Sequence, residues 1–118
     1  AIAQVVALMR AAGMTATVSS IHINGWFGTH SKWTGAQWAV AECTGRQLVD
    51  EVAHWLYVGD STNDQVMFQR LPMSVGVANL MRFADALHAW PAYITQGERG
   101  HGFAQVASAL LAARTTPR

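Results

Sequence analysis

Short apolar runs that alternate with helical patterns limit what this 118-residue chain can fold into. From Lys32 onward, three such runs cover residues 55–58, 73–78 and 92–95. Strands buried on both faces produce runs of this kind, and strands that alternate with helices assemble into parallel sheets. The sequence therefore predicts an α/β fold with a parallel sheet and flanking helices.

The N-terminal part of the chain predicts one helix and one strand. Apolar residues at helical spacing predict a helix before Gly13, and β-branched residues predict a single strand over residues 15–24. Asn24-Gly25 and Gly28 predict a turn or hinge after that strand. We therefore expect residues 1–28 and 29–118 to belong to different modules.

Caps and apolar spacing predict the remaining helices. Ser31 is suited to cap the first of them, and Thr44 to open the second. A glycine-rich segment before Phe103 predicts a loop. The expected helices cover residues 32–43, 44–53, 64–70, the stretch from Asn79 and the stretch from Phe103, with the loop at 97–102.

Composition excludes several classes of protein. A net charge of +1 gives no electrostatic signature for nucleic acid. No apolar run reaches membrane-spanning length. The single cysteine, Cys43, cannot form a disulfide within the chain, which favours a reducing, cytoplasmic location.

The segment Gly59-Asp60-Ser61-Thr62-Asn63-Asp64, here called the acidic loop, carries the strongest chemical signal. It follows a buried strand and precedes a helix, and ligands of open α/β sheets bind at the carboxyl ends of strands. Asp60 and Asp64 are one helical turn apart, so both can face one crevice. Two close carboxylates repel unless a proton or a cation lies between them, and Mg²⁺ suits such a pair. The alternative is an ordinary turn in which Asp and Asn act as caps.

Lys32, the chain's only lysine, is a candidate anion-binding residue. It lies in the first turn of a predicted helix, where the helix dipole disfavours a cation. A bound anion would compensate, because helix N-termini attract phosphate. The alternative is a solvated surface lysine, for which the dipole costs only about 0.3–1 kcal/mol.

The acidic loop and its surroundings resemble the haloacid dehalogenase-like phosphatases. The Asn63-Asp64 pair is similar to the subgroup with a large inserted cap, which acts on sugar phosphates. Four blocks carry the resemblance in order: Ser31-Lys32; Val58 to Asp64 followed by Met67-Phe68; Ser74 to Asn79; and Ala92 to Thr95 followed by Gly102-Phe103-Ala104.

The resemblance implies a Mg²⁺-dependent phosphatase with a Rossmann-like core that hydrolyses a small phosphate monoester, a sugar or sugar-acid phosphate, through an aspartyl-phosphate. It implies that Asp60 binds the metal directly and that Asp64 binds it directly or through water. Lys32 would neutralise charge around the phosphate, and Asn63 would orient the phosphate or the nucleophile. Ser61 would support the loop.

The nucleophile of that family, an aspartate in an Asp-x-Asp motif, has no counterpart here, since the first acidic residue is Glu42. We expect the motif and most of the cap before Ala1, with residues 1–28 as the last helix and strand of the cap. The isolated chain is then expected to be inactive. The strand at 55–58 is expected to be an open edge, or to pair with another chain or with the missing segment.

Two alternative functions remain open at this stage. The absent Asp-x-Asp motif would also suit a non-catalytic interaction or regulatory module on the same fold. A sugar phosphomutase of the same superfamily would transfer the phosphate between sugars instead of releasing it. The cap distinguishes a mutase from a phosphatase. The sequence leaves the phosphate ester and the oligomeric state undetermined.

Overall fold

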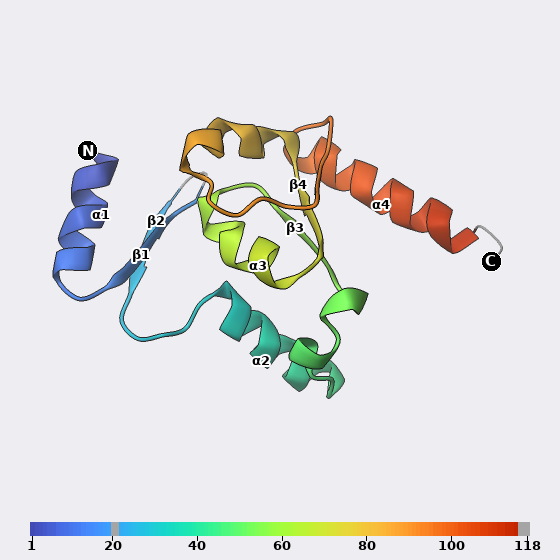
Figure 1. Cartoon of the computed structure of the whole chain (residues 1–118), viewed down its shortest axis with the longest axis horizontal. Coiled ribbons are helices and arrows are strands. Elements are labelled where there is room, and N and C mark those ends of the chain that lie inside the picture. Colours follow the sequence, from blue (N-terminus) through green and yellow to red (C-terminus); the bar gives the residue numbers. More distant parts are fainter. Residues whose placement is uncertain (20–21, 116–118) are drawn as a thin grey trace.

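Two separate sheets organise the protein, whose computed structural model describes residues 1–19 and 22–115 (Figure 1). One is a two-stranded antiparallel sheet and the other a three-stranded parallel sheet. The predicted α/β class is confirmed. The radius of gyration is 16.0 Å, against about 13 Å for a compact chain of this length, because an N-terminal lobe lies at one end and a helix projects at the other.

The N-terminal lobe consists of α1 (Ile2–Ala11), β1 (Thr15–Val18) and β2 (Ile23–Trp26). The prediction of one strand over 15–24 is wrong, because the chain reverses between the two strands. The backbone N–H of Ser19 donates to the His22 carbonyl at 2.8 Å, and the Ser19 hydroxyl accepts from the His22 N–H at 3.0 Å.

The predicted turn or hinge is correct at Gly28, which has a φ of 102° in a bend over residues 27–29, and wrong at Asn24-Gly25. Asn24-Gly25, the stronger turn signal, lies inside β2, where Gly25 pairs with Ala16. A Cβ at Gly25 would approach the Met9 and Met14 side chains to 2.9 Å, so packing of α1 on the hairpin explains this glycine. Residues 20 and 21, which the predicted strand included, lie outside the described residues.

The parallel sheet has the order β3-β4-β5, from β3 (Leu56–Gly59), β4 (Met73–Gly76) and β5 (Tyr93–Ile94). Because side chains of a strand alternate between faces, this sheet has two different faces. The covered face carries Tyr57 and its partner Ser74, and Tyr57 packs against both core clusters. The open face carries Leu56, Met73 and Val75, which line a groove beside α4 (Arg99–Thr115).

The covered face is buried by α2 (Lys32–Thr44), α3 (Gln65–Arg70) and η4, a 3₁₀ segment (Ala78–Ala86). Two clusters of buried side chains form beneath these elements. Trp33, Leu48, Met67 and Leu71 make up the first, and Phe68, Leu80 and Leu87 the second.

Among the described residues, β3 has a strand on one side only, which is β4. The prediction that β3 is an open edge, or pairs outside these residues, holds to this extent: no second strand of the described residues flanks it. The carboxyl end of β3 leads directly into the acidic loop, so the edge and the loop are adjacent.

Three predicted helices have different bounds or geometry. In place of a helix over residues 44–53, the chain has two short 3₁₀ segments, η1 (Leu48–Asp50) and η2 (Val52–His54). Thr44 does not open a helix because its hydroxyl donates back to the Val40 carbonyl at 2.6 Å, and Gly45, with φ of 72°, ends α2. The stretch from Asn79 is 3₁₀ rather than α-helical, and α4 begins inside the predicted 97–102 loop.

Candidate functional site

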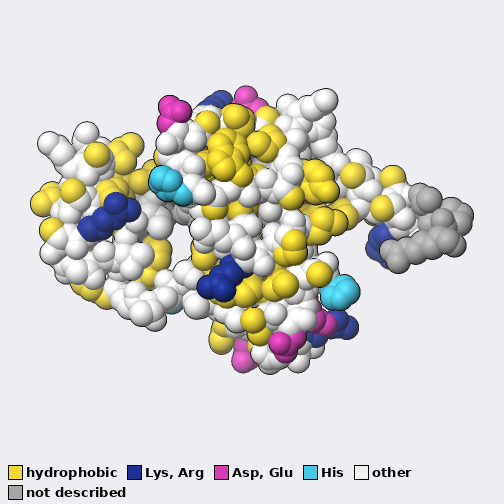
Figure 2. All heavy atoms as spheres, viewed as in Figure 1, with side chains coloured by type: hydrophobic (Ala, Val, Ile, Leu, Met, Phe, Trp, Pro, Cys, Tyr) yellow, Lys and Arg dark blue, Asp and Glu magenta, His cyan; other side chains and the backbone are white. Residues whose placement is uncertain are grey.

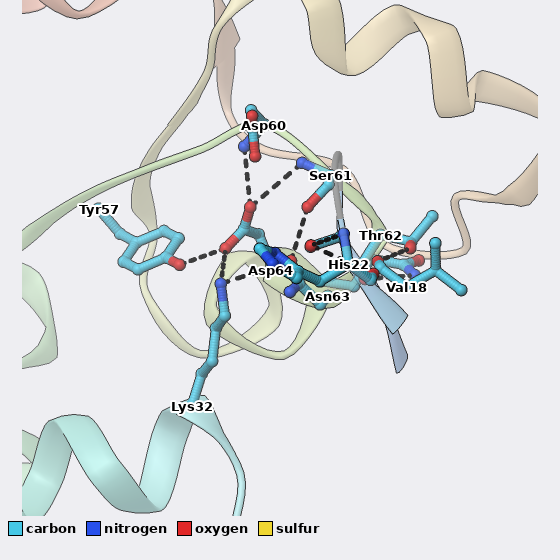
Figure 3. Close-up of polar contacts among 11 residues, drawn as sticks. Val18, His22, Lys32, Tyr57, Asp60, Ser61, Thr62, Asn63 and Asp64 are labelled. Atoms are coloured by element: carbon cyan, nitrogen blue, oxygen red, sulfur yellow. Dashed lines mark hydrogen bonds and ion pairs between the residues drawn. The ribbon is translucent and has the colours of Figure 1, made fainter. Parts of the chain in front are cut away.

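The acidic loop joins the end of β3 to α3 through η3, a 3₁₀ turn (Thr62–Asp64). Four of the sequence-predicted site residues, Lys32, Ser61, Asn63 and Asp64, are brought together here (Figure 3). Asp64 lies at the centre and is only 3% exposed. The site is therefore built around a buried carboxylate rather than on an exposed turn.

Four donors surround the Asp64 carboxylate. Its Oδ1 accepts from the Lys32 ammonium at 2.6 Å and from the Tyr57 hydroxyl. Its Oδ2 accepts from the backbone N–H groups of Asp60 at 2.8 Å and Ser61 at 3.1 Å. Both oxygens are thus occupied by the chain itself, which leaves Asp64 poorly suited to bind a metal directly in this arrangement.

Gly59 allows Asp64 to reach this position. A Cβ built on Gly59 would lie 2.6 Å from the Asp64 Cγ, a distance at which one of the two groups must move. No larger residue fits there without displacing the carboxylate. The last residue of β3 is therefore a glycine because of close approach, and not because of an unusual backbone angle.

Ser31 positions Lys32 as the sequence predicts. The Ser31 hydroxyl accepts from the Thr34 N–H at 3.3 Å, and the Ser31 N–H donates to the Thr34 hydroxyl at 2.7 Å. This reciprocal cap starts α2 at Lys32. The Lys32 side chain, 43% exposed, extends across to the acidic loop.

Ser61 and Lys32 both hold Asn63. The Ser61 hydroxyl donates to Asn63 Oδ1 at 2.6 Å, and the Lys32 ammonium lies 3.4 Å from the same oxygen. With Oδ1 engaged, the Asn63 amide nitrogen remains to donate toward the cleft that Asn63 lines. Ser61 is buried, so its contacts are with the loop, in the supporting position that the sequence suggests.

Charge in this cluster is fixed by hydrogen bonding. Burial alone would raise the pKa of Asp64, but hydrogen bonds from Lys32, Tyr57 and the Asp60 N–H outweigh it and lower the pKa. Burial, followed by the hydrogen bond to Asp64, raises the pKa of Tyr57 well above its usual range. At neutral pH Asp64 is therefore ionised, and Tyr57 is a protonated donor.

Asp60 differs from Asp64. Within residues 1–19 and 22–115, its carboxylate makes no hydrogen bond or ion pair. It lines a shallow pocket of about 330 Å³ together with Lys32, Asp64 and Arg99. The free carboxylate beside a lysine is the group in this cluster that has ligand capacity to spare.

The free Asp60 carboxylate fits a magnesium site that takes one carboxylate ligand from this chain. Mg²⁺ in proteins commonly binds one or two carboxylates and completes its shell with waters and substrate phosphate. No cluster of three or more His, Cys, Asp and Glu side chains suited to a metal occurs in the described part of the chain. Asp64 fits the role of a residue that fixes the loop and Lys32.

Three residues of the site were missed from the sequence. Tyr57 could have been found, because Tyr57 and Gly59 share a face by strand alternation and Gly59 contacts Asp64. Arg99, with a positive φ of 49°, donates its N–H to Asn79 Oδ1 at 2.8 Å and lines the Asp60 pocket. Thr62 donates its hydroxyl to the Val18 carbonyl at 2.7 Å, and no local pattern predicts that contact.

No protein-family model, curated protein or solved structure matches this chain. Among the described residues, no helix has the length and apolar character needed to cross a bilayer.

Proposed function

We propose that this chain supplies the phosphate- and magnesium-binding half of a haloacid dehalogenase-like phosphatase acting on a small phosphate monoester. The ion pair between Lys32 and Asp64, 2.6 Å long and joining residues 32 positions apart, carries the proposal. It brings the only lysine to the acidic loop, beside the free carboxylate of Asp60.

Lys32 is suited to bind phosphate because its ammonium has a donor to spare. An ammonium has three N–H donors, and in this cluster Asp64 and Asn63 take two of them. The third can reach an oxygen of a bound phosphate. Asn63 would add a donor from its amide nitrogen, and Tyr57 would keep Asp64, and through it Lys32, in position.

Asp60 would hold the magnesium ion, which, when bound, would shield the negative charge of the phosphoryl oxygens. Asp64 would not compete for the ion, since its four donors keep it ionised and fixed. The two aspartates would thus have separate tasks, one toward the metal and one toward the lysine.

The nucleophile would come from outside these 118 residues, since they contain no Asp-x-Asp motif. A carboxylate oxygen of that motif would attack phosphorus, the ester P–O bond would break, and the motif's second aspartate would protonate the leaving alkoxide. Water would then hydrolyse the aspartyl-phosphate and release inorganic phosphate. The open edge of β3 would accept the strand that carries this nucleophile, because an unpaired edge recruits another strand. That strand would come from a segment outside these 118 residues, in the same protein or in a second copy of it.

Cytoplasmic action fits the same proposal. Cys43 is free and exposed, and an exposed thiol persists best in a reducing compartment.

The closest rival is a structural loop, in which the Lys32–Asp64 pair only ties α2 to β3. Titration of the ¹⁵N-labelled chain with inorganic phosphate, with and without Mg²⁺, separates the two. We expect phosphate to shift the amide signals of Lys32 and Asn63, and Lys32→Met to weaken binding at least tenfold. Asp60→Asn should remove the Mg²⁺ enhancement and leave the weaker metal-free binding.

Two matched variants control this experiment. Lys32→Arg keeps the charge and should retain most of the binding, and Asp85→Asn removes an exposed carboxylate in η4, remote from the acidic loop in sequence. Phosphate binding that is absent, or that Lys32→Met leaves unchanged, refutes the proposal. A phosphatase screen of the chain together with whatever its gene encodes ahead of Ala1 extends the test to catalysis, with Asp60→Asn again as the inactive variant.

A further inference from the structure

A second cleft, of about 520 Å³, lies between the N-terminal lobe and the acidic loop. Lys32 and Asn63 line it on one side, and the strands of the β1–β2 hairpin line it on the other. Figure 2 shows the N-terminal lobe joined to the rest of the molecule at a narrower waist. The cleft therefore extends from Lys32 and Asn63, the proposed phosphate-binding residues, to the hairpin.

The hairpin presents three polar side chains and one indole to this cleft. Thr15 pairs with Trp26 and Thr17 with Asn24, so strand alternation puts all four on one side of the hairpin, and all four line the cleft. On the other side Ala16 is buried. The polar side chains thus line a concavity that they share with Lys32, with Thr15 and Asn24 also exposed to solvent.

A hydrogen bond holds the hairpin over the acidic loop. The Thr62 hydroxyl donates to the carbonyl of Val18, at the end of β1, at 2.7 Å (Figure 3). Thr62 precedes Asn63 in the chain, so this bond fixes the hairpin close to the phosphate-binding side chains. One ligand can then contact both sides of the cleft.

The chemistry of the cleft selects for a neutral, hydroxyl-rich group. Among the described residues that line it, Lys32 is accompanied by no Asp, Glu or Arg, and His30 is the other ionisable side chain. Thr15, Thr17 and Asn24 supply hydroxyl and amide groups that both donate and accept hydrogen bonds. The indole N–H of Trp26 donates to the His30 carbonyl at 2.8 Å, and its ring stacks on the His30 ring, which fixes the indole as a flat wall for C–H groups.

We infer that the polar face of the β1–β2 hairpin binds the leaving group of the phosphate ester, and that this group is a neutral polyol rather than a sugar acid. The inference rests on the proposed function, because Lys32 and Asn63 supply the phosphate end of the site. A carboxylate in the cleft would find Lys32 as its one lysine or arginine partner, and there it would compete with the phosphate.

A matched set of ligands tests this inference on the intact chain. Inorganic phosphate, sorbitol 6-phosphate and 6-phosphogluconate differ in the group attached to phosphorus, and the last two differ mainly by a CH₂OH replaced with a carboxylate. We expect sorbitol 6-phosphate to bind about tenfold more tightly than inorganic phosphate, the equivalent of about 1.4 kcal/mol, and 6-phosphogluconate to gain little. The Trp26 indole signal, assigned by its loss in Trp26→Phe, should shift with sorbitol 6-phosphate.

Two variants assign the effect to the hairpin. Thr17→Val keeps the shape of the side chain but removes its hydroxyl, and Asn24→Leu removes an amide. Together they should reduce sorbitol 6-phosphate to the affinity of inorganic phosphate while leaving inorganic phosphate unchanged. Ser108→Ala removes an exposed hydroxyl on α4, outside the cleft lining, and should change neither affinity.

The outcomes separate the two proposals. If inorganic phosphate binds in a Lys32-dependent way but sorbitol 6-phosphate gains nothing and leaves Trp26 unmoved, the hairpin inference is wrong and the proposed function stands. A preference for 6-phosphogluconate likewise overturns the inference alone. Absence of all phosphate binding removes both.

Discussion

The two faces of the parallel sheet differ in how far the chain covers them, although the same strands form both. On the covered face, Tyr57 and Gly59 support a buried carboxylate beneath packed helices. On the open face, Leu56 and Met73 line an apolar groove of about 470 Å³ beside α4, and hydrophobic side chains gather on the visible surface beside the base of that helix (Figure 2). The chain by itself thus supplies all four donors around Asp64, but leaves Met73 and Tyr93 of the open face exposed.

The covered face therefore determines the positions of Lys32 and Asp64, while cover on the open face would bear mainly on the stability of the fold. The groups that hold Lys32 and Asp64 all come from this chain, so the site geometry needs no further partner. Burial of the open face would add apolar contacts worth about 25 cal/mol per Å² covered. A partner strand and helix would therefore change the stability of the fold more than the arrangement of the acidic loop.

The largest expected effect lies in the core of the covered face. Leu80 is 0% exposed and packs with Phe68 and Leu87. Leu80→Ala should lower the free energy of unfolding by about 2–5 kcal/mol through lost burial and a cavity. Urea denaturation measures this, with Leu111→Ala on α4, where the side chain is 62% exposed, as the control expected to stay within about 0.5 kcal/mol. Equal losses in both variants would abolish the distinction between the two regions.

Tyr57→Phe should cost about 1.5–3 kcal/mol at neutral pH, the usual value of a hydrogen bond to a charged group. The difference from wild type should shrink in acid, because a lowered pKa gives Asp64 stability that is present above its unfolded pKa of about 3.9 and is lost as pH falls through the folded value. It should also shrink above about pH 10, because the raised pKa of Tyr57 gives stability that is lost once the unfolded tyrosine ionises.

Urea titrations at several pH values measure the difference in free energy of unfolding between wild type and Tyr57→Phe, which should be largest near neutral pH and smaller in acid and in alkali. Groups unaffected by the substitution cancel when the two curves are subtracted. A difference that is flat from pH 3 to pH 11 would mean that Tyr57 stabilises by packing alone.

Gly59→Ala tests the close contact under the acidic loop. The added methyl would lie 2.6 Å from the Asp64 Cγ, and overpacking of this kind costs about 1–3 kcal/mol. Gly35→Ala is the matched control: nothing lies within 4 Å of its Cβ, and inside α2 alanine should stabilise by up to about 1 kcal/mol. Opposite signs in urea denaturation support the packing account, and a neutral Gly59→Ala contradicts it.

Met73→Lys should have the smallest effect on stability. Met73 is 45% exposed on the open face, so the change should stay within about 0.5 kcal/mol while lowering the binding of an apolar dye such as ANS. Sedimentation at several concentrations accompanies the measurement. A loss above about 2 kcal/mol would instead show that this face is buried in solution, and the comparison between the two faces would then apply only to the isolated chain.

Local signals predicted the parts of the site that are close in sequence. Ser31 caps the helix that begins at Lys32, and the acidic loop follows a strand and precedes a helix, as expected. These features depend on turn and cap chemistry, which acts over three or four residues. The open edge of β3 was also predicted, from the resemblance rather than from any local pattern.

Features that depend on distant contacts were not predicted. Asn24-Gly25 was a misleading turn signal, because Gly25 pairs within β2 and lies against the Met9 side chain of α1, while the bond between Ser19 and His22 is local and gives only a weak signal. The start of α4 at Arg99 contradicts a glycine-rich sequence, and the Arg99 N–H is held by Asn79, twenty residues earlier. Tertiary contacts outweigh local propensity at both places.

The two aspartates of the loop show the same limit. Their spacing predicted that both could face one crevice, and both do line the Asp60 pocket. It could not predict that Asp64 is enclosed by four donors while Asp60 keeps its oxygens free, because one of those donors, Lys32, comes from α2, 32 positions earlier in the chain.

The bond between Thr62 and Val18 also bears on how often the cleft opens. A single neutral hydrogen bond contributes about 0.5–1.5 kcal/mol, so its removal should shift the balance toward an open arrangement by roughly twofold to tenfold. Separation of the N-terminal lobe from the acidic loop would let a ligand enter the cleft, and Thr62→Val would make this separation more frequent. Spin labels on α1 and α3 would report this as a broadened distance distribution, and a single narrow peak in both proteins would argue for a rigid pair of lobes.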